Sequence, residues 1–175
     1  MTFTIHCTKK LLERVKPPVN AEQITPTTYL GNWYATRLFW KPQVAMLVNE
    51  LTLLPVLTPL APAAKLAQRF PEHLASVLFV HGAPHALIDH ELPAMFDFQY
   101  AKTANRSLIG ILNQFTYLAE GYREYNQTTD LRWLSMKLSQ TPCSPLYKKA
   151  ISPDRELRRL IETAWTNTAA HDQRY

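Results

Sequence analysis

The sequence predicts an α+β fold, in which an antiparallel sheet of about five strands is packed by helices and the last third of the chain is helical. Short runs of β-forming residues occupy 2–7, 32–57 and 95–101, and the breaks within 32–57 are short enough for hairpins. Apolar residues recur every three or four positions over 59–80 and 106–122, as they do along one face of a helix. With 175 residues, 46% hydrophobic and 19% charged, the chain has the composition of one folded domain.

The N-terminal elements are expected to be a strand, a short helix and a three-stranded meander. Polar and apolar residues alternate over 2–7, which predicts a strand, and an amphipathic helix follows over 9–15 until two prolines end it. The segment 19–29 has no periodicity, so we expect a surface loop. Three apolar runs then form the centre of the predicted sheet: 32–40, 44–49 and 52–57.

The middle of the chain is expected to return from helices to the sheet. Helical spacing over 59–80 is interrupted by Pro71, which favours the first position of a helix, so we predict two short helices rather than one. Residues 84–91 are expected to add a helical turn. The alternation over 95–101 predicts a further strand.

Helices are expected to complete the chain. The longest runs over 106–122 and should cover one face of the sheet, and others are predicted over 129–138 and from Pro153 to about 165 with Ser152 as the cap. We therefore expect a single domain, 1–175, with an α+β core over about 1–125, a helical extension over about 126–166 and a frayed tail over 167–175.

Composition limits the classes of function. Two cysteines lie far apart, the N-terminus lacks the order of a secretion signal, and prolines interrupt the longest apolar stretch, over 51–67. His81, His85 and His90 do not have the spacing of metal ligands, so a solvated loop is expected there. We expect a cytoplasmic protein with no membrane association, no metal and no cofactor.

Two strand-to-helix junctions carry the strongest functional signal. In each, an apolar extended run ends at a capping residue, and basic residues follow in the first helical turn. Cations there oppose the positive end of the helix dipole unless an anion offsets them. The net charge of +5 is concentrated in the same parts of the chain, so we predict a phosphate-binding surface formed by these residues: Thr8, Lys9, Lys10, Lys102, Thr103, Asn105, Arg106 and Ser107.

An alternative is that these threonines and the asparagine only cap helices while the cations point into water. The phosphate-binding interpretation gains strength if the two preceding strands run parallel and side by side.

Secondary contacts are predicted in the meander. An exposed Trp33 could stack a base near Arg37 and Lys41, as in proteins that bind single strands. The alternative is a tryptophan in the hydrophobic core.

The chain also resembles a family of uncharacterised bacterial domains of unknown function. The resemblance covers about residues 3–115 and rests on four motifs: Cys7-Thr8-Lys9-Lys10-Leu11-Leu12, Trp33-Tyr34-Ala35, Leu47-Val48-Asn49-Glu50-x-Thr52 and Lys102-Thr103-x-Asn105-Arg106-Ser107-x-x-Gly110-x-x-Asn113. Relatives tend to have Trp-His-Ala-Asn where this chain has Trp33-Tyr34-Ala35-Thr36, which weakens the case for a catalytic histidine there. The resemblance implies an accessory protein of a mobile element or defence locus.

The expected function is therefore that of a nucleic-acid-binding accessory protein, with DNA or RNA as partner, rather than a catalyst. One alternative is a protein-interaction or antitoxin-like regulatory module that uses an apolar face over 60–80. A second is an enzyme acting on a phosphorylated or nucleic-acid substrate with Cys7, His6 or Asn113. That alternative requires a polar pocket near the junctions.

Overall fold

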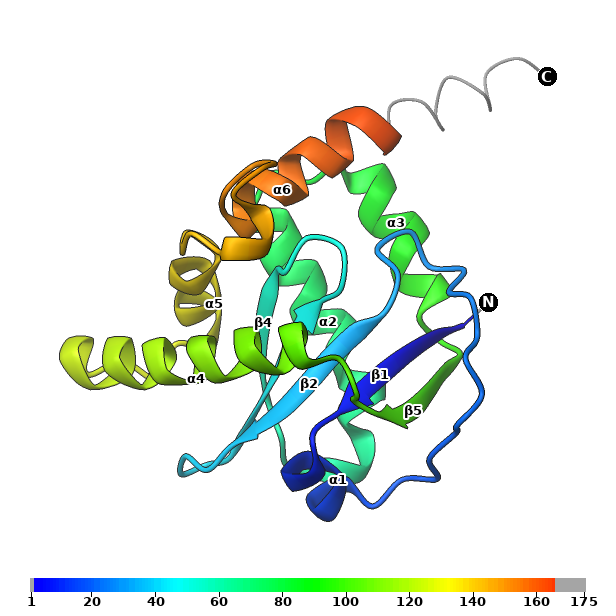
Figure 1. The fold of residues 1–175 in the computed structure, drawn as a ribbon, viewed down its shortest axis with the longest axis vertical. Coiled ribbons are helices and arrows are strands. Elements are labelled where there is room, and N and C mark those ends of the chain that lie inside the picture. Colours follow the sequence, from blue (N-terminus) through cyan, green and yellow to red (C-terminus); the bar gives the residue numbers. More distant parts are fainter. Residues whose placement is uncertain (1, 166–175) are drawn as a thin grey trace.

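The computed structural model describes residues 2–165, which form a five-stranded sheet with helices on both faces (Figure 1). The strands are β1 (Phe3–Cys7), β2 (Trp33–Leu38), β3 (Val44–Asn49), β4 (Pro55–Pro59) and β5 (Phe98–Lys102). The α-helices are α1 (Lys9–Val15), α2 (Leu66–Val80), α3 (His85–Ala94), α4 (Arg106–Asn126), α5 (Leu131–Ser139) and α6 (Pro153–Leu160). Short 3₁₀ turns cover Ala63–Lys65 and Ser144–Leu146, and a π-helical turn covers Ile161–Trp165.

The α+β class and the five strands are confirmed, but the sheet is mixed rather than purely antiparallel. Its order is β4-β3-β2-β1-β5. The meander β2-β3-β4 is antiparallel as predicted, whereas β1 runs parallel to both β2 and β5. The connection from β1 to β2 contains α1, and the chain reaches β5 through α2 and α3, so long connections let β1 run in the same direction as both neighbours.

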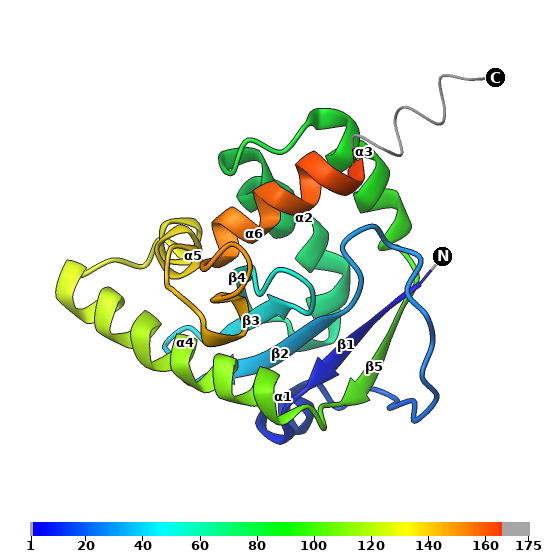
Figure 2. The same cartoon turned by 45° about the horizontal axis from the view of Figure 1, so that its top comes forward.

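Each face of the sheet has its own hydrophobic core. Helices α1, α2 and α3 pack on one face around Phe70 and Trp33, and Figure 2 shows α2 and α3 on the far side of the sheet from α4. On the other face α4 packs against β2 and β3, and α5 packs against β4. Among the described residues, the core beneath α4 and α5 contains none of β1 or β5, and loop residues line that part of the second face.

Helix α2 differs from the prediction, because Pro71 lies inside one helix instead of starting a second. A proline in a helix interior costs about 3 kcal/mol. The stripe Phe70, Leu74, Val77 and Leu78 is buried without interruption across this position, and that packing holds the two halves in line. The large apolar side chains predicted over 60–80 as a face for a protein partner are consequently in the core, except for Phe79 and Val80 at the end of the helix, which are exposed.

The C-terminal elements follow the prediction in outline. Helix α4 continues past the expected end at 122 to Asn126, and Asp130 caps α5 by accepting the Trp133 N–H. The predicted tail over 167–175 lies outside the described residues. Among the described helices, none is long and apolar enough to cross a membrane.

Candidate functional site

The two basic junctions lie side by side. Strands β1 and β5 pair in parallel with Cys7 opposite Lys102, so both strands end at the same edge of the sheet. The Thr103 N–H donates to the Cys7 carbonyl at 3.0 Å, and the Thr8 N–H donates to the Ala35 carbonyl of β2 at 3.0 Å. We call this carboxyl-end edge of β1, β2 and β5 the basic edge.

Beyond the basic edge, the two helices leave on opposite faces of the sheet. Leu11 of α1 belongs to one core and Leu108 of α4 to the other. Neighbouring parallel strands whose helices diverge in this way form the kind of crevice in which open α/β sheets bind ligands. The divergence therefore supports a binding surface where the junctions meet.

The capping residues differ from one another. Asn105 caps α4, since its side-chain oxygen accepts the Leu108 N–H at 3.1 Å. Thr8 makes no side-chain cap to α1; its hydroxyl oxygen lies 3.0 Å from the hydroxyl oxygen of Thr36 on β2. Thr8 thus ties β1 to β2 instead of capping the helix.

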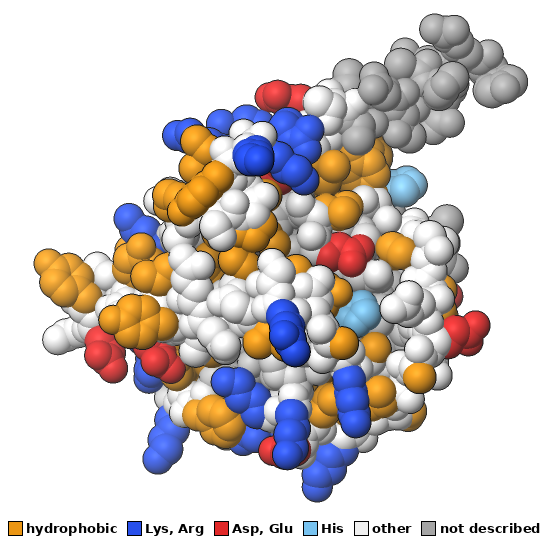
Figure 3. All heavy atoms as spheres, viewed as in Figure 1, with side chains coloured by type: hydrophobic (Ala, Val, Ile, Leu, Met, Phe, Trp, Pro, Cys, Tyr) orange, Lys and Arg blue, Asp and Glu red, His pale blue; other side chains and the backbone are white. Residues whose placement is uncertain are grey.

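The cations of the junctions remain in solvent. Lys9, Lys102, Arg106 and the neighbouring Ser107 are exposed, and Lys10 is partly exposed. Figure 3 shows Lys and Arg side chains gathered over the lower part of the molecule, where α1 and the ends of the parallel strands lie in Figure 1. A second group of cations lies over α6 at the top of the same view, where Arg159 pairs with Glu156.

The predicted role of Trp33 is wrong. Its side chain is fully buried and meets Phe70 edge-on at 4.9 Å between ring centroids, so it cannot stack a base. The exposed aromatic residue beside the predicted cations is Phe39, which lies 4.3 Å under the Arg37 guanidinium. Lys41 is exposed in the turn that follows β2.

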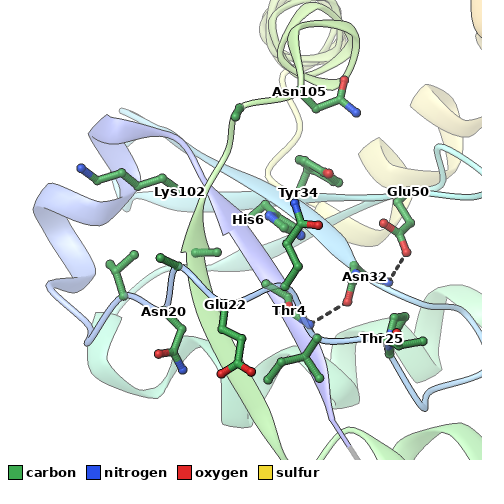
Figure 4. A pocket seen from close by; sticks show the side chains of 17 residues that line it. Thr4, His6, Asn20, Glu22, Thr25, Asn32, Tyr34, Glu50, Lys102 and Asn105 are labelled. Carbon is green, nitrogen blue, oxygen red and sulfur yellow. Dashed lines mark hydrogen bonds between the residues drawn. The ribbon is translucent and has the colours of Figure 1, made fainter.

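A polar pocket opens beside the basic edge, over the part of β1 and β5 that none of the described helices covers (Figure 4). Its volume is about 1120 Å³. The strands supply Thr4, His6, Tyr34, Ala101 and Lys102, while the other walls are the loop 19–26, Asn32, Glu50, Ala104 and Asn105. Of the eight predicted phosphate-binding residues, only Lys102 and Asn105 line this pocket, and the Lys102 side chain points away from its centre (Figure 4).

His6 and Tyr34 form the centre of the pocket. Their rings stack in parallel with centroids 4.5 Å apart and an angle of 14° between the planes. Burial lowers the pKa of His6, while the Glu50 carboxylate and a hydrogen bond to the Lys102 backbone oppose that shift. Burial and Glu50 raise the pKa of Tyr34, and a hydrogen bond with the Asn105 side chain opposes it. At neutral pH both groups are therefore uncharged.

The far wall of the pocket is held by hydrogen bonds between partly buried and buried polar groups. The Glu50 carboxylate accepts the Asn32 N–H at 2.9 Å, and the Asn32 side chain in turn accepts the Thr4 N–H at 2.8 Å. Gly31 is needed here, because its φ is +77° and a Cβ would lie 2.8 Å from Glu50 Oε1. Fully buried Asn49 fixes the same region by accepting the Thr52 N–H and donating to the Leu30 carbonyl.

Sequence reasoning had singled out His6 but missed Tyr34, Glu50 and Asn32 as site residues. The available signal was the polar set Thr4 and His6, which alternates with the apolar residues of β1. Such alternation predicts a strand with one polar face, but the partner strands that complete a pocket cannot be read from it.

The residues proposed for catalysis are separated by the structure. Cys7 is buried on the opposite face of β1 from His6, and burial raises the pKa of its thiol far above the ordinary range. Asn113 is exposed on α4 and does not line the pocket. The polar pocket that an enzyme would require is present with His6 in it, so the enzymatic alternative stays a prediction. Among residues 2–165, no group of three His, Cys, Asp or Glu side chains could hold a metal ion.

Comparison with known protein families shows to which family the chain belongs. The model of a domain of unknown function (DUF6933) matches residues 4–156. The protein belongs to that family. The predicted resemblance of residues 3–115 to a domain family of unknown function is thus confirmed, and the match extends through α5 into α6. No curated protein and no solved structure matched the chain.

Proposed function

We propose that this DUF6933 protein binds nucleic acid by its phosphates at the basic edge. The observation that carries the proposal is the parallel pairing of β1 and β5, which brings together two junctions that lie almost a hundred positions apart in the sequence. Cations from both junctions, exposed or partly exposed to solvent, therefore lie near the same edge of the sheet: Lys9, Lys10, Lys102 and Arg106.

The arrangement suits an extended polyanion better than a single phosphate ion. The cations are exposed and spread over the starts of two helices on opposite faces, and Lys102 points from β5 toward α1 (Figure 4). Contacts of this kind hold the backbone of a nucleic acid without reading its sequence. The accessory role at a mobile-element or defence locus remains a prediction from the family resemblance.

The test is the salt dependence of binding, measured by fluorescence anisotropy with labelled single-stranded and double-stranded DNA and RNA. Each lost phosphate contact should reduce the slope of log K against log salt by about one unit. We expect the double variant Lys102→Ala with Arg106→Ala to lower the slope by about two units and to weaken binding to all sequences alike.

The matched control is Arg155→Ala with Arg158→Ala, which removes the same charge from exposed positions of α6. We expect this control to leave the slope unchanged. A slope that falls in the α6 variant and not in the edge variant would move the binding surface to α6, and the absence of binding at low salt would overturn the proposal.

A further inference from the structure

Along the floor of the pocket, one position beside His6 is left without a large side chain. The parallel register places Tyr34, His6 and Ala101 in one row across β2, β1 and β5. Tyr34 and His6 fill their places with stacked rings, whereas Ala101 contributes only a methyl group. Neighbouring strands lie about 4.8 Å apart, so the space over Ala101 is about as wide as the spacing between stacked rings.

In the adjacent row of the same sheet face, the corresponding space on β5 is filled by a side chain. Thr4 lies opposite Gln99, and the Gln99 amide fills that row by donating to the Thr4 hydroxyl at 3.0 Å. Gln99 also donates to the Glu22 carbonyl at 3.2 Å and accepts from the Asn20 side chain at 3.1 Å. Gln99 thus closes one end of the space, and the residues that follow Ala101 in the chain, Lys102, Ala104 and Asn105, line the pocket at the other end.

The loop 19–26 forms the outer wall of the same space. Val19 pairs with Tyr100 as an isolated bridge, and the Asn20 N–H donates to the Tyr100 carbonyl at 2.9 Å. Both contacts fix the start of the loop against β5, so the wall exists before any ligand arrives. We call the space between His6, Ala101 and this loop the slot.

The charges around the slot indicate what it excludes. Glu50 and Glu22 line the pocket, and the one lysine of the lining points outward (Figure 4). A phosphate group would therefore be repelled from the interior and attracted to the basic edge outside. A planar, uncharged ring with hydrogen-bond donors suits the interior, since Glu50 offers carboxylate oxygens.

We propose that the slot takes one unpaired nucleobase of a bound single strand, stacked on the face of the His6 ring opposite Tyr34. The inference rests on the proposed nucleic-acid binding and assigns a base contact to it. Phosphates on either side of that base lie at the basic edge, which places backbone and base in neighbouring compartments of one site.

The experiment compares two probes of equal length, a thymidine oligonucleotide and a strand of the same sugar-phosphate backbone without bases. Stacking on an aromatic side chain makes binding on the order of 10-fold tighter. Wild-type protein should prefer the strand with bases by about that factor, at a salt concentration where both bind. Binding to the strand without bases reports the phosphate contacts alone.

Two pairs of variants test the slot. Ala101→Leu fills it and should bring the preference down toward 1, whereas Ala101→Ser leaves it open and should keep the preference. His6→Leu removes the aromatic face and should lose the preference, whereas His6→Phe restores a ring and should regain it. Thermal unfolding of each variant identifies any that fail to fold.

The outcomes separate the two proposals. An unchanged preference in both Ala101→Leu and His6→Leu would overturn the slot while leaving phosphate binding in place. If the wild-type protein bound neither probe, the proposed function and the slot would be overturned together. Equal loss of preference in His6→Leu and His6→Phe would show that stacking is not the cause.

Discussion

The two faces of strand β1 differ in kind. Phe3, Ile5 and Cys7 point into the core beneath α1 and α2 and are at most 1% exposed. Their neighbours Thr4 and His6 point to the other face, where they form the floor of the pocket. A single five-residue strand therefore carries both the fold and the candidate site, and substitutions one position apart should affect different properties.

The largest effect is expected on the apolar face. Ile5→Ala should lower the free energy of unfolding by about 2–5 kcal/mol, because it leaves a cavity between the sheet and its helices. Urea unfolding measures the loss. The adjacent His6→Phe should cost much less, since His6 lies at a partly open surface. Similar losses at both positions would show that the pocket face is as tightly packed as the core.

A smaller effect is expected at Glu91, which anchors the segment between the pocket loop 19–26 and Asn32. The buried Glu91 carboxylate accepts the Tyr29 N–H at 2.7 Å and the Leu30 N–H at 3.0 Å, which holds the segment before β2. Glu91→Ala should cost about 1–3 kcal/mol by leaving both donors without an acceptor.

The pH dependence of Glu91 supplies a second measurement. Burial raises the pKa of Glu91 in the folded protein, although the two N–H groups oppose the shift. The folded state then binds the proton more tightly than the unfolded state, so stability should fall as the pH rises from the ordinary glutamate pKa through the raised one. Glu91→Gln should lack this fall. A stability curve of the same shape in both proteins would contradict the raised pKa.

The smallest effect is expected from the titration of His6. Its pKa is lowered in the folded protein, so the unfolded chain binds the proton more readily. The contribution of His6 to the free energy of unfolding should therefore increase as the pH rises from the lowered pKa to the ordinary value near 6.5. Above that pH it should level off. Relative to His6→Phe, wild-type protein should become more stable over this range in chemical unfolding. A loss of stability over the same range would mean that the effect of Glu50 on the pKa of His6 is larger than the effect of burial.

Alternation and helical spacing predicted the helices and strands better than they predicted which side chains are exposed and which strands pair. The residue pattern indicated β1, the meander and α4, because each carries its own periodicity. It could not indicate that β1 lies between β2 and β5, since pairing partners leave no local signal. Trp33 shows the same problem: both faces of β2 are covered, so alternation could not reveal that Phe39 rather than Trp33 would be exposed.

The candidate site was predictable only in part. Asn105 was correctly expected to cap α4, whereas Thr8 found a partner on β2 that local sequence does not encode. Glu50 was noticed as part of a motif, but its place in the pocket depends on the turn built by Asn49. The sequence predicted the contact that Asn105 makes with residues close to it in the chain. It did not predict the contacts of Thr8 and Glu50, which depend on residues from other strands and turns.

The pairing of β1 with β5 also bears on how the chain folds. Phe3 lies opposite Phe98, so this pair of strands forms only when about half of the chain has been brought together. Pairings of such long range form slowly compared with local helices and hairpins. The meander and α1 can assemble first, whereas the β5 side of the slot is added late. A chain released before residue 102 would carry β1 with an unpaired edge, which invites association with other chains.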